Sequence, residues 1–187
     1  IYRLRGLLIV TWLIFFIPVL MDVNLLHAEE NMTLTLKSSA FDNGSEIPSR
    51  YTCEGEDISP PLGRTGVPEA AKSLVMVIDD PDEPDPKAQN MIWVHWVLYN
   101  IPPDVSGLPE GIVPAKLSPV MVAGLNDWNN SGNGGPCPPL GRHRYFHKLY
   151  ALDTVLEEMK TATKSKVEAA MKGHVISQTE LVGTYQK

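Results

Sequence analysis

Proline restricts the fold of this chain more than any other residue type. The sequence contains 16 prolines in 187 residues, which is more than the usual share of about 5% would give. Because proline fixes φ and lacks a backbone donor, it interrupts helices and central strands. We therefore expect a mainly β protein with many turns and short strands. A hydrophobic content of 43% is enough for one globular core.

Three segments have the patterns of core strands. Residues 73–78 are continuously apolar after Ser73, which predicts a strand buried on both faces. Residues 91–99 form a second strand, in which simple alternation would put His95 and Trp96 on opposite faces. Residues 143–152 form a third, on which His143, Tyr145 and His147 share one face.

Weaker patterns complete the predicted secondary structure. Residues 33–36 and 180–185 are expected to be the first and last strands. Ser165 and Glu168 have the spacing of a capping box, so we expect a helix that begins there and ends near Gly173, packed against the sheet.

The N-terminal segment has the order of a secretory signal peptide. Arg3 and Arg5 precede an apolar run over residues 7–21, and small residues up to Ala28 follow. We expect residues 1–28 to be the signal peptide and residues 29–187 to be the mature domain, exported to the periplasm or secreted. The alternative is an uncleaved anchor, although the run is shorter than a membrane span needs. After cleavage no stable membrane span is expected.

Charge and cysteine content limit the partners and the chemistry. A formal net charge of −6 makes nucleic acid an unfavourable partner. Export would place the two cysteines in an oxidising compartment, so we expect a Cys53–Cys137 disulfide, with two free thiols as the alternative. No C-x-x-C metal spacing occurs, and we expect neither a metal nor a cofactor.

A glycine- and proline-rich loop over residues 134–142 leads directly into the strand that carries His143 and Tyr145. Proline rings fix such a loop, and glycines allow backbone N–H groups to approach a ligand closely. This arrangement suits a small anion. Two aspartates, Asp80 and Asp82, follow the first core strand, and His95 lies within the second.

Taken in order, these motifs resemble the phosphatidylethanolamine-binding protein family, and within it the bacterial branch described as Raf-kinase-inhibitor-like. The likeness covers residues 33–187. It includes Asp57 to Leu62, Asp79 to Pro84, Trp93 to Pro102, the glycine- and proline-rich loop and Glu180 to Tyr185. The resemblance implies two packed antiparallel sheets with a C-terminal helix against them. It also implies a ligand-binding pocket formed by Asp80, Asp82, Pro84, His95, Gly135, Pro138, His143 and Tyr145.

The carboxylates in that set would act indirectly, because they repel an anion. A carboxylate bonded to an imidazole fixes its tautomer, so that the other ring N–H can donate to the ligand. Tyr145 would donate its hydroxyl to an anion oxygen. Considered singly, Asp80 and Asp82 could be turn formers, and His95 could be a core histidine.

The leading hypothesis is therefore non-enzymatic binding of a small anionic group, such as phosphate or a phospholipid headgroup, with regulation of a protein partner as an additional hypothesis. No Gly-x-Ser-x-Gly nucleophile motif occurs. The alternatives are a protease or kinase inhibitor-type interaction module, and a hydrolase that uses the Asp and His cluster for acid–base or metal chemistry. Arg64 and Asn133 stand where the family usually has aromatic residues, and we expect both to lie away from the inner pocket.

Overall fold

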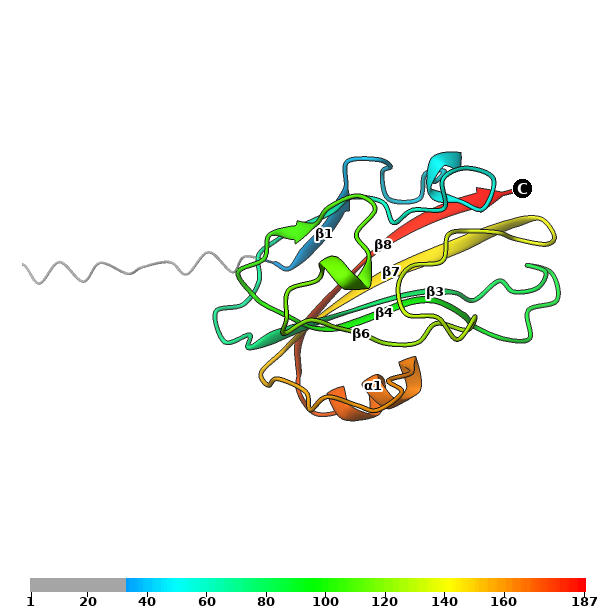
Figure 1. Ribbon diagram of the computed structural model, residues 1–187. Helices are drawn as coiled ribbons and strands as arrows, with labels where there is room; N and C mark the ends of the chain where they lie inside the picture. The colour runs from blue at the N-terminus through cyan, green and yellow to red at the C-terminus, as the bar shows by residue number, and fades with distance from the viewer. Residues whose placement is uncertain (1–32) are drawn as a thin grey trace, which may run out of the picture. The chain divides into compact units, whose positions relative to one another are not determined.

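Two antiparallel sheets form the framework of residues 33–187, which are the residues that the computed structural model describes (Figure 1). The smaller sheet has the order β1-β2-β5, with strands Thr35–Ser38, Leu62–Thr65 and Gly107–Leu108. The larger sheet has the order β6-β4-β3-β7-β8, with strands Val122–Ala123, Trp93–Ile101, Ser73–Asp80, Arg142–Leu152 and Val175–Gln186. The mainly β prediction is confirmed, although β1 and β4 are each shifted by two residues and β8 is twice as long as expected. The predicted signal peptide lies outside the described residues.

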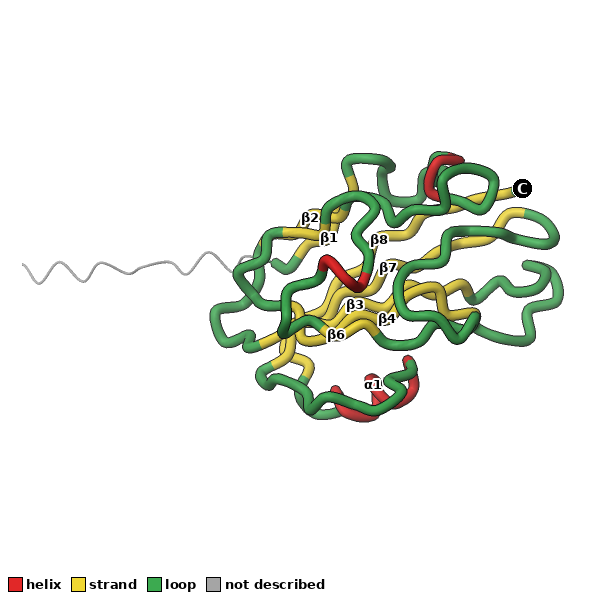
Figure 2. The backbone as a smooth tube through the Cα atoms, in the orientation of Figure 1, coloured by secondary structure: helices red, strands yellow, loops and turns green. Residues whose placement is uncertain are grey.

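One α-helix, α1 (Lys164–Met171), lies against the larger sheet, on the side opposite β1 (Figure 1). Two short 3₁₀ helices, Ser49–Tyr51 and Pro114–Lys116, lie in the connections (Figure 2). The predicted capping box is wrong. The N-cap is Thr163, without a side-chain cap hydrogen bond, so the helix begins two residues earlier than the motif indicated. Within residues 33–187, no helix has the length and apolar character to cross a membrane.

Strand β3 contributes side chains to two hydrophobic cores, one on each face of the larger sheet. Leu74, Met76 and Ile78 pack between the two sheets, whereas Val75 and Val77 pack on the side of α1. Every residue of β3 is buried, as the continuous apolar run predicted.

The helix is also tied to the sheet by charge. The Asp79 side chain is 1% exposed and faces the Nζ atoms of Lys148 at 2.8 Å and of Lys164 at 2.6 Å. Lys164 is the first residue of α1, so this buried carboxylate fixes the start of the helix on β3 and β7.

Strand β4 does not alternate as the sequence predicted. Its pairing with β3 shifts register between Ile78 and Asp79, because Ile78 pairs with Trp96 and Asp79 pairs with Val94. His95 lies between Val94 and Trp96 and has no pairing partner on β3. Such a bulge turns a side chain out of the regular pattern. The His95 and Trp96 side chains both lie on the side of the smaller sheet, where His95 meets Tyr145 and Trp96 joins the core between the sheets.

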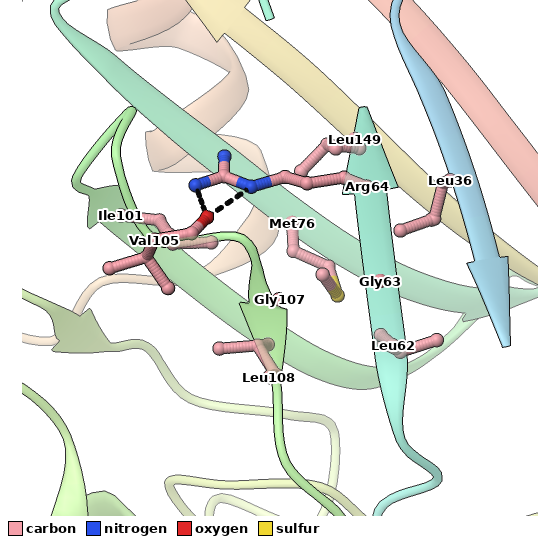
Figure 3. A pocket seen from close by; sticks show the side chains of 10 residues that line it. All are labelled: Leu36, Leu62, Gly63, Arg64, Met76, Ile101, Val105, Gly107, Leu108 and Leu149. Atoms are coloured by element: carbon pink, nitrogen blue, oxygen red, sulfur yellow. Dashed lines mark hydrogen bonds between the residues drawn. The ribbon is translucent and has the colours of Figure 1, made fainter. Parts of the chain in front are cut away.

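Arg64 on β2 bonds to backbone and lies away from the predicted pocket. Its Nε donates to the carbonyl oxygen of Val105 at 2.6 Å, and Nη2 donates to that of Pro102 at 2.7 Å. Figure 3 shows the guanidinium reaching across a small apolar cavity between the sheets toward Val105. Burial lowers the pKa of Arg64 to about 10. This side chain closes the β2–β5 edge of the sandwich.

Candidate functional site

A cavity of about 230 Å³ lies at one end of the larger sheet. Antiparallel pairing places the last residue of β3 beside the first residue of β4 and near the start of β7. Polar residues at those strand ends therefore meet, although they are distant in the sequence. The cavity is lined by Asp80, Glu83, Trp93, His95, Trp128, Cys137, Pro139 and Tyr145.

Asp80, which lines the cavity, forms a buried pair with His143, which does not line it. Asp80 Oδ2 lies 2.6 Å from His143 Nδ1, and Asp80 Oδ1 accepts the backbone N–H of Asp82 at 2.7 Å. The other ring nitrogen of His143 lies 3.0 Å from the carbonyl oxygen of Leu140, to which its N–H donates. The expectation that this N–H would point to a ligand is therefore wrong, because the backbone of the loop already accepts it.

Asp82 belongs to a different cluster. It forms a two-point ion pair with Arg144, with Nε 2.8 Å from Oδ2 and Nη2 2.7 Å from Oδ1. Its Oδ2 also accepts the backbone N–H of Arg144 at 2.9 Å, and Gln89 donates to Oδ1. These bonds from Arg144 hold the pKa of Asp82 below its usual value. Asp82 fixes the turn after β3 to β7 and does not line the cavity.

His95 lines the cavity as a neutral side chain. Burial lowers its pKa, and its Nδ1–H donates to the carbonyl oxygen of Gly134 at 2.8 Å. The Nε2 atom of the neutral ring is therefore an acceptor, and it has no hydrogen-bond partner within residues 33–187. The ring meets Tyr145 and Trp128 edge to face, with centroids 5.1 Å apart in each pair.

Two donors of the cavity lining have no partner. The Tyr145 hydroxyl and the Trp93 indole N–H are both buried, and neither makes a hydrogen bond within the described part of the chain. Tyr145 is 1% exposed. Burial raises the pKa of Tyr145 far above its usual value, so its hydroxyl keeps its proton. Unsatisfied buried donors are uncommon in folded proteins, and here they mark a place for a ligand or water.

The loop contributes shape, while its backbone donors are used internally. The Gly135 N–H donates to Asp57 Oδ1 at 2.8 Å, and the Gly134 N–H donates to the carbonyl oxygen of His95 at 3.1 Å. The expected approach of these N–H groups to a ligand is thus not observed. Cys137 is joined to Cys53 by a disulfide with a Cα–Cα distance of 5.4 Å. Pro84 and Pro138 lie in the two loops beside the cavity but do not line it.

Sequence reasoning missed half of the cavity lining. Glu83 stands within the recognised Asp80–Pro84 motif and could have been found there, and Trp93 begins the strand that carries His95. Pro139 lies in the glycine- and proline-rich loop, next to Pro138, which was the proline predicted there. Nothing local marks Trp128. Asn133 was expected to lie away from the pocket. It does not line the cavity of about 230 Å³, in agreement with that expectation. It lines a second cavity of about 10 Å³, which His95 and Tyr145 also line. His147, which is not among the predicted site residues, lines that second cavity too.

A model of the phosphatidylethanolamine-binding protein family matches residues 37–186. The chain belongs to this family. Two similar curated relatives are named as UPF0098 proteins. One from Methanothermobacter thermautotrophicus is 50% identical over 155 residues, covering 82% of this chain and 99% of the relative. One from Chlamydia trachomatis is 45% identical over 154 residues, with the same coverage.

Solved structures of family members share the fold. A putative phosphatidylethanolamine-binding protein homolog from Chlamydia trachomatis superposes with a TM-score of 0.76 at 44% identity, covering 83% of this chain and 99% of the homolog. Escherichia coli YbcL, described as a member of the mammalian family, superposes with a TM-score of 0.73 at 30% identity, covering 82% and 98%. The predicted family and the predicted architecture are therefore confirmed.

Proposed function

We propose that this family member is a non-enzymatic binding protein for a small anionic group, such as phosphate or a phospholipid headgroup. The observation that carries the proposal is the Tyr145 hydroxyl, which is buried, protonated and unpartnered in a cavity of about 230 Å³. A tetrahedral oxyanion would accept hydrogen bonds from this hydroxyl and from the Trp93 indole N–H. Each bond to a charged acceptor contributes on the order of 1.5–3 kcal/mol.

His95 would add a third donor only after it takes up a proton. Its Nε2 is an acceptor while the ring is neutral, and an anion beside it would favour the charged form. Anion binding should therefore be coupled to proton uptake and strengthen as the pH falls. The edge-to-face contacts with Tyr145 and Trp128 keep the ring in the position that this step requires.

Binding is favoured over catalysis by the state of Cys137. Cys137 is the one cysteine in the cavity lining. Its sulfur is bonded to that of Cys53, so it cannot act as a thiolate nucleophile. The hydrolase and the inhibitor-type hypotheses remain predictions. Export remains a proposal too, and the disulfide supports it because such bonds persist in oxidising compartments.

Replacement of Tyr145 by Phe tests the proposal. Phosphate titrated into wild type at pH 6 should bind measurably by calorimetry, and Tyr145→Phe should weaken that binding about tenfold, in line with the loss of one charge-assisted bond. The unfolding free energy should stay the same or rise, because the variant removes an unsatisfied buried hydroxyl. Tyr150→Phe, in the same strand but outside the cavity lining, is the matched control. Equal phosphate affinity in wild type and Tyr145→Phe would refute the role given to the hydroxyl.

A further inference from the structure

The cavity offers more acceptors than donors. Asp80 and Glu83 bring carboxylates into its lining, and the neutral His95 brings an unpaired ring nitrogen. Against these stand only the two unpartnered donors, on Trp93 and Tyr145. An anion entering this space would meet mostly negative or lone-pair atoms, so a positive charge is needed beside it.

The hydrogen bonds of His143 show where that charge fits. Its Nε2–H donates to the carbonyl oxygen of Leu140 at 3.0 Å. Its Nδ1 faces two carboxylates, with Asp80 Oδ2 at 2.6 Å and Glu83 Oε2 at 3.7 Å. A ring nitrogen and two carboxylates that converge in this way require a proton or a metal ion between them. An imidazole whose other N–H is bonded to a backbone carbonyl has the orientation typical of metal-ligating histidines.

We propose that Asp80, Glu83 and His143 form a binding site for one divalent first-row metal ion, with Zn²⁺ as the best fit. One atom from each residue lies within 4.8 Å of the other two. An imidazole nitrogen and two carboxylate oxygens form a ligand set that zinc accepts, at about 2.0–2.2 Å from the ion. In a tetrahedral site with those distances, two ligand atoms lie roughly 3.3–3.5 Å apart, so the 2.6 Å pair of Asp80 and His143 would have to separate by roughly 0.7–0.9 Å.

The site has an entry path and open coordination positions. The His143 side chain is fully buried, but that of Glu83 is 21% exposed and lines the cavity, so an ion can enter from there. Three protein ligands leave at least one position of a four-coordinate zinc for water or an anion oxygen. The Tyr145 hydroxyl, 99% buried and without a partner in the same cavity, is available to bond to whatever occupies that position.

This inference rests on the proposed function in one respect, because the ion would supply the positive charge that an anion needs among the carboxylates. The metal site itself can be measured without any anion. The ligands come from widely separated segments, Asp80 and Glu83 on one side and His143 on the other, so no local sequence spacing could reveal them.

Zn²⁺ titration of chelator-treated protein tests the site. Calorimetry on the wild type should show one ion per chain with micromolar or tighter affinity. Glu83→Gln removes one ligand and should weaken binding on the order of 10- to 100-fold or more. Glu157→Gln is the matched control, since it removes the same charge from an exposed position without an ion pair and should leave the affinity unchanged.

The outcomes separate the two proposals. Binding of Zn²⁺ that is equal in wild type and Glu83→Gln would point to a surface site, such as the exposed His174 and Asp153 pair, and would overturn the inference. Phosphate that binds without any Zn²⁺ affinity would overturn the metal site and leave the anion site standing. If Zn²⁺ binds in a way that depends on Glu83, but phosphate binds neither with nor without Zn²⁺, the metal site stands and the anion site is overturned. Tighter phosphate binding in the presence of Zn²⁺ would support both.

A second measurement needs no variant, in case a substitution disturbs folding. Co²⁺ bound at this site should shift and broaden the indole N–H signals of Trp93 and Trp128 in the nuclear magnetic resonance spectrum, because both line the cavity. The signal of Trp96, in the core between the sheets, should be affected less. A spectrum in which no indole signal of the cavity responds to one equivalent of Co²⁺ would contradict the proposed position.

Discussion

Removal of the Cys53–Cys137 disulfide should lower the stability of the domain without changing its site. The two cysteines are 84 residues apart in the sequence, so the bond closes a long loop in the unfolded chain. The chain-entropy relation gives about 4.5 kcal/mol for a loop of that size at 25 °C. Both residues are exposed, so Cys53→Ser with Cys137→Ser removes little buried area and isolates the cross-link.

Urea denaturation measures this loss. With a slope of about 2 kcal/mol per molar urea, the midpoint of the double variant should fall by roughly 2 M. In thermal unfolding the same loss corresponds to roughly 10–15 °C. Reduction of the wild type should reproduce the shift, which controls for effects of the serines.

Phosphate affinity should be nearly unchanged in the folded double variant. The loop stays attached by two hydrogen bonds beside the cross-link, from Gly135 N–H to Asp57 and from Cys53 N–H to the carbonyl oxygen of Pro136. A stability loss below about 1 kcal/mol would refute the argument from the unfolded state. Loss of phosphate binding in a variant that remains folded would show that the cross-link shapes the site directly.

Three further changes test other parts of the structure. Asp79→Asn should cost roughly 3 kcal/mol in urea denaturation, because it leaves Lys148 and Lys164 partly buried without their carboxylate, and a loss under 1 kcal/mol would contradict this. Gly135→Ala should destabilise by about 1–3 kcal/mol, since a Cβ there would lie 2.4 Å from a carboxylate oxygen and 2.5 Å from a backbone oxygen; wild-type stability would show that the loop moves aside easily. Burial lowers the pKa of His147 to about 4 in the folded state, so the unfolded chain takes up a proton first as the pH falls. The contribution of His147 to the unfolding free energy should therefore decline by up to about 3 kcal/mol between pH 6.5 and 4, and over that range the unfolding free energy should depend less on pH in His147→Gln.

The strands that the sequence predicted well are those whose patterns come from burial alone. The continuous apolar run of β3 indicated a strand covered on both sides, and β3 contributes to both cores. The face assignment failed in β4, because alternation holds only while the register is regular. The bulge depends on pairing with β3, which lies outside the pattern of β4 itself.

For the site, sequence reasoning identified the segments but not the partners of their side chains. Asp80 and Asp82 look equivalent in the motif, yet one pairs with His143 and the other with Arg144. The partner of each aspartate depends on the alternation of side chains along β7, which puts His143 on the buried face and leaves Arg144 exposed. Which ring nitrogen of His143 remains available also depends on the path of the loop at Leu140, and no residue type encodes that path.

Asp79 and Asp80 are neighbours whose side chains leave β3 in opposite directions, toward α1 and toward the cavity. Asp79, which holds the start of α1, is therefore joined directly to Asp80, which lines the cavity. A perturbation that loosens α1 should be felt by a bound ligand through this shared backbone, although no part of the helix lines the cavity. Variants on the outer surface of α1 could in this way alter ligand affinity from the far side of the sheet.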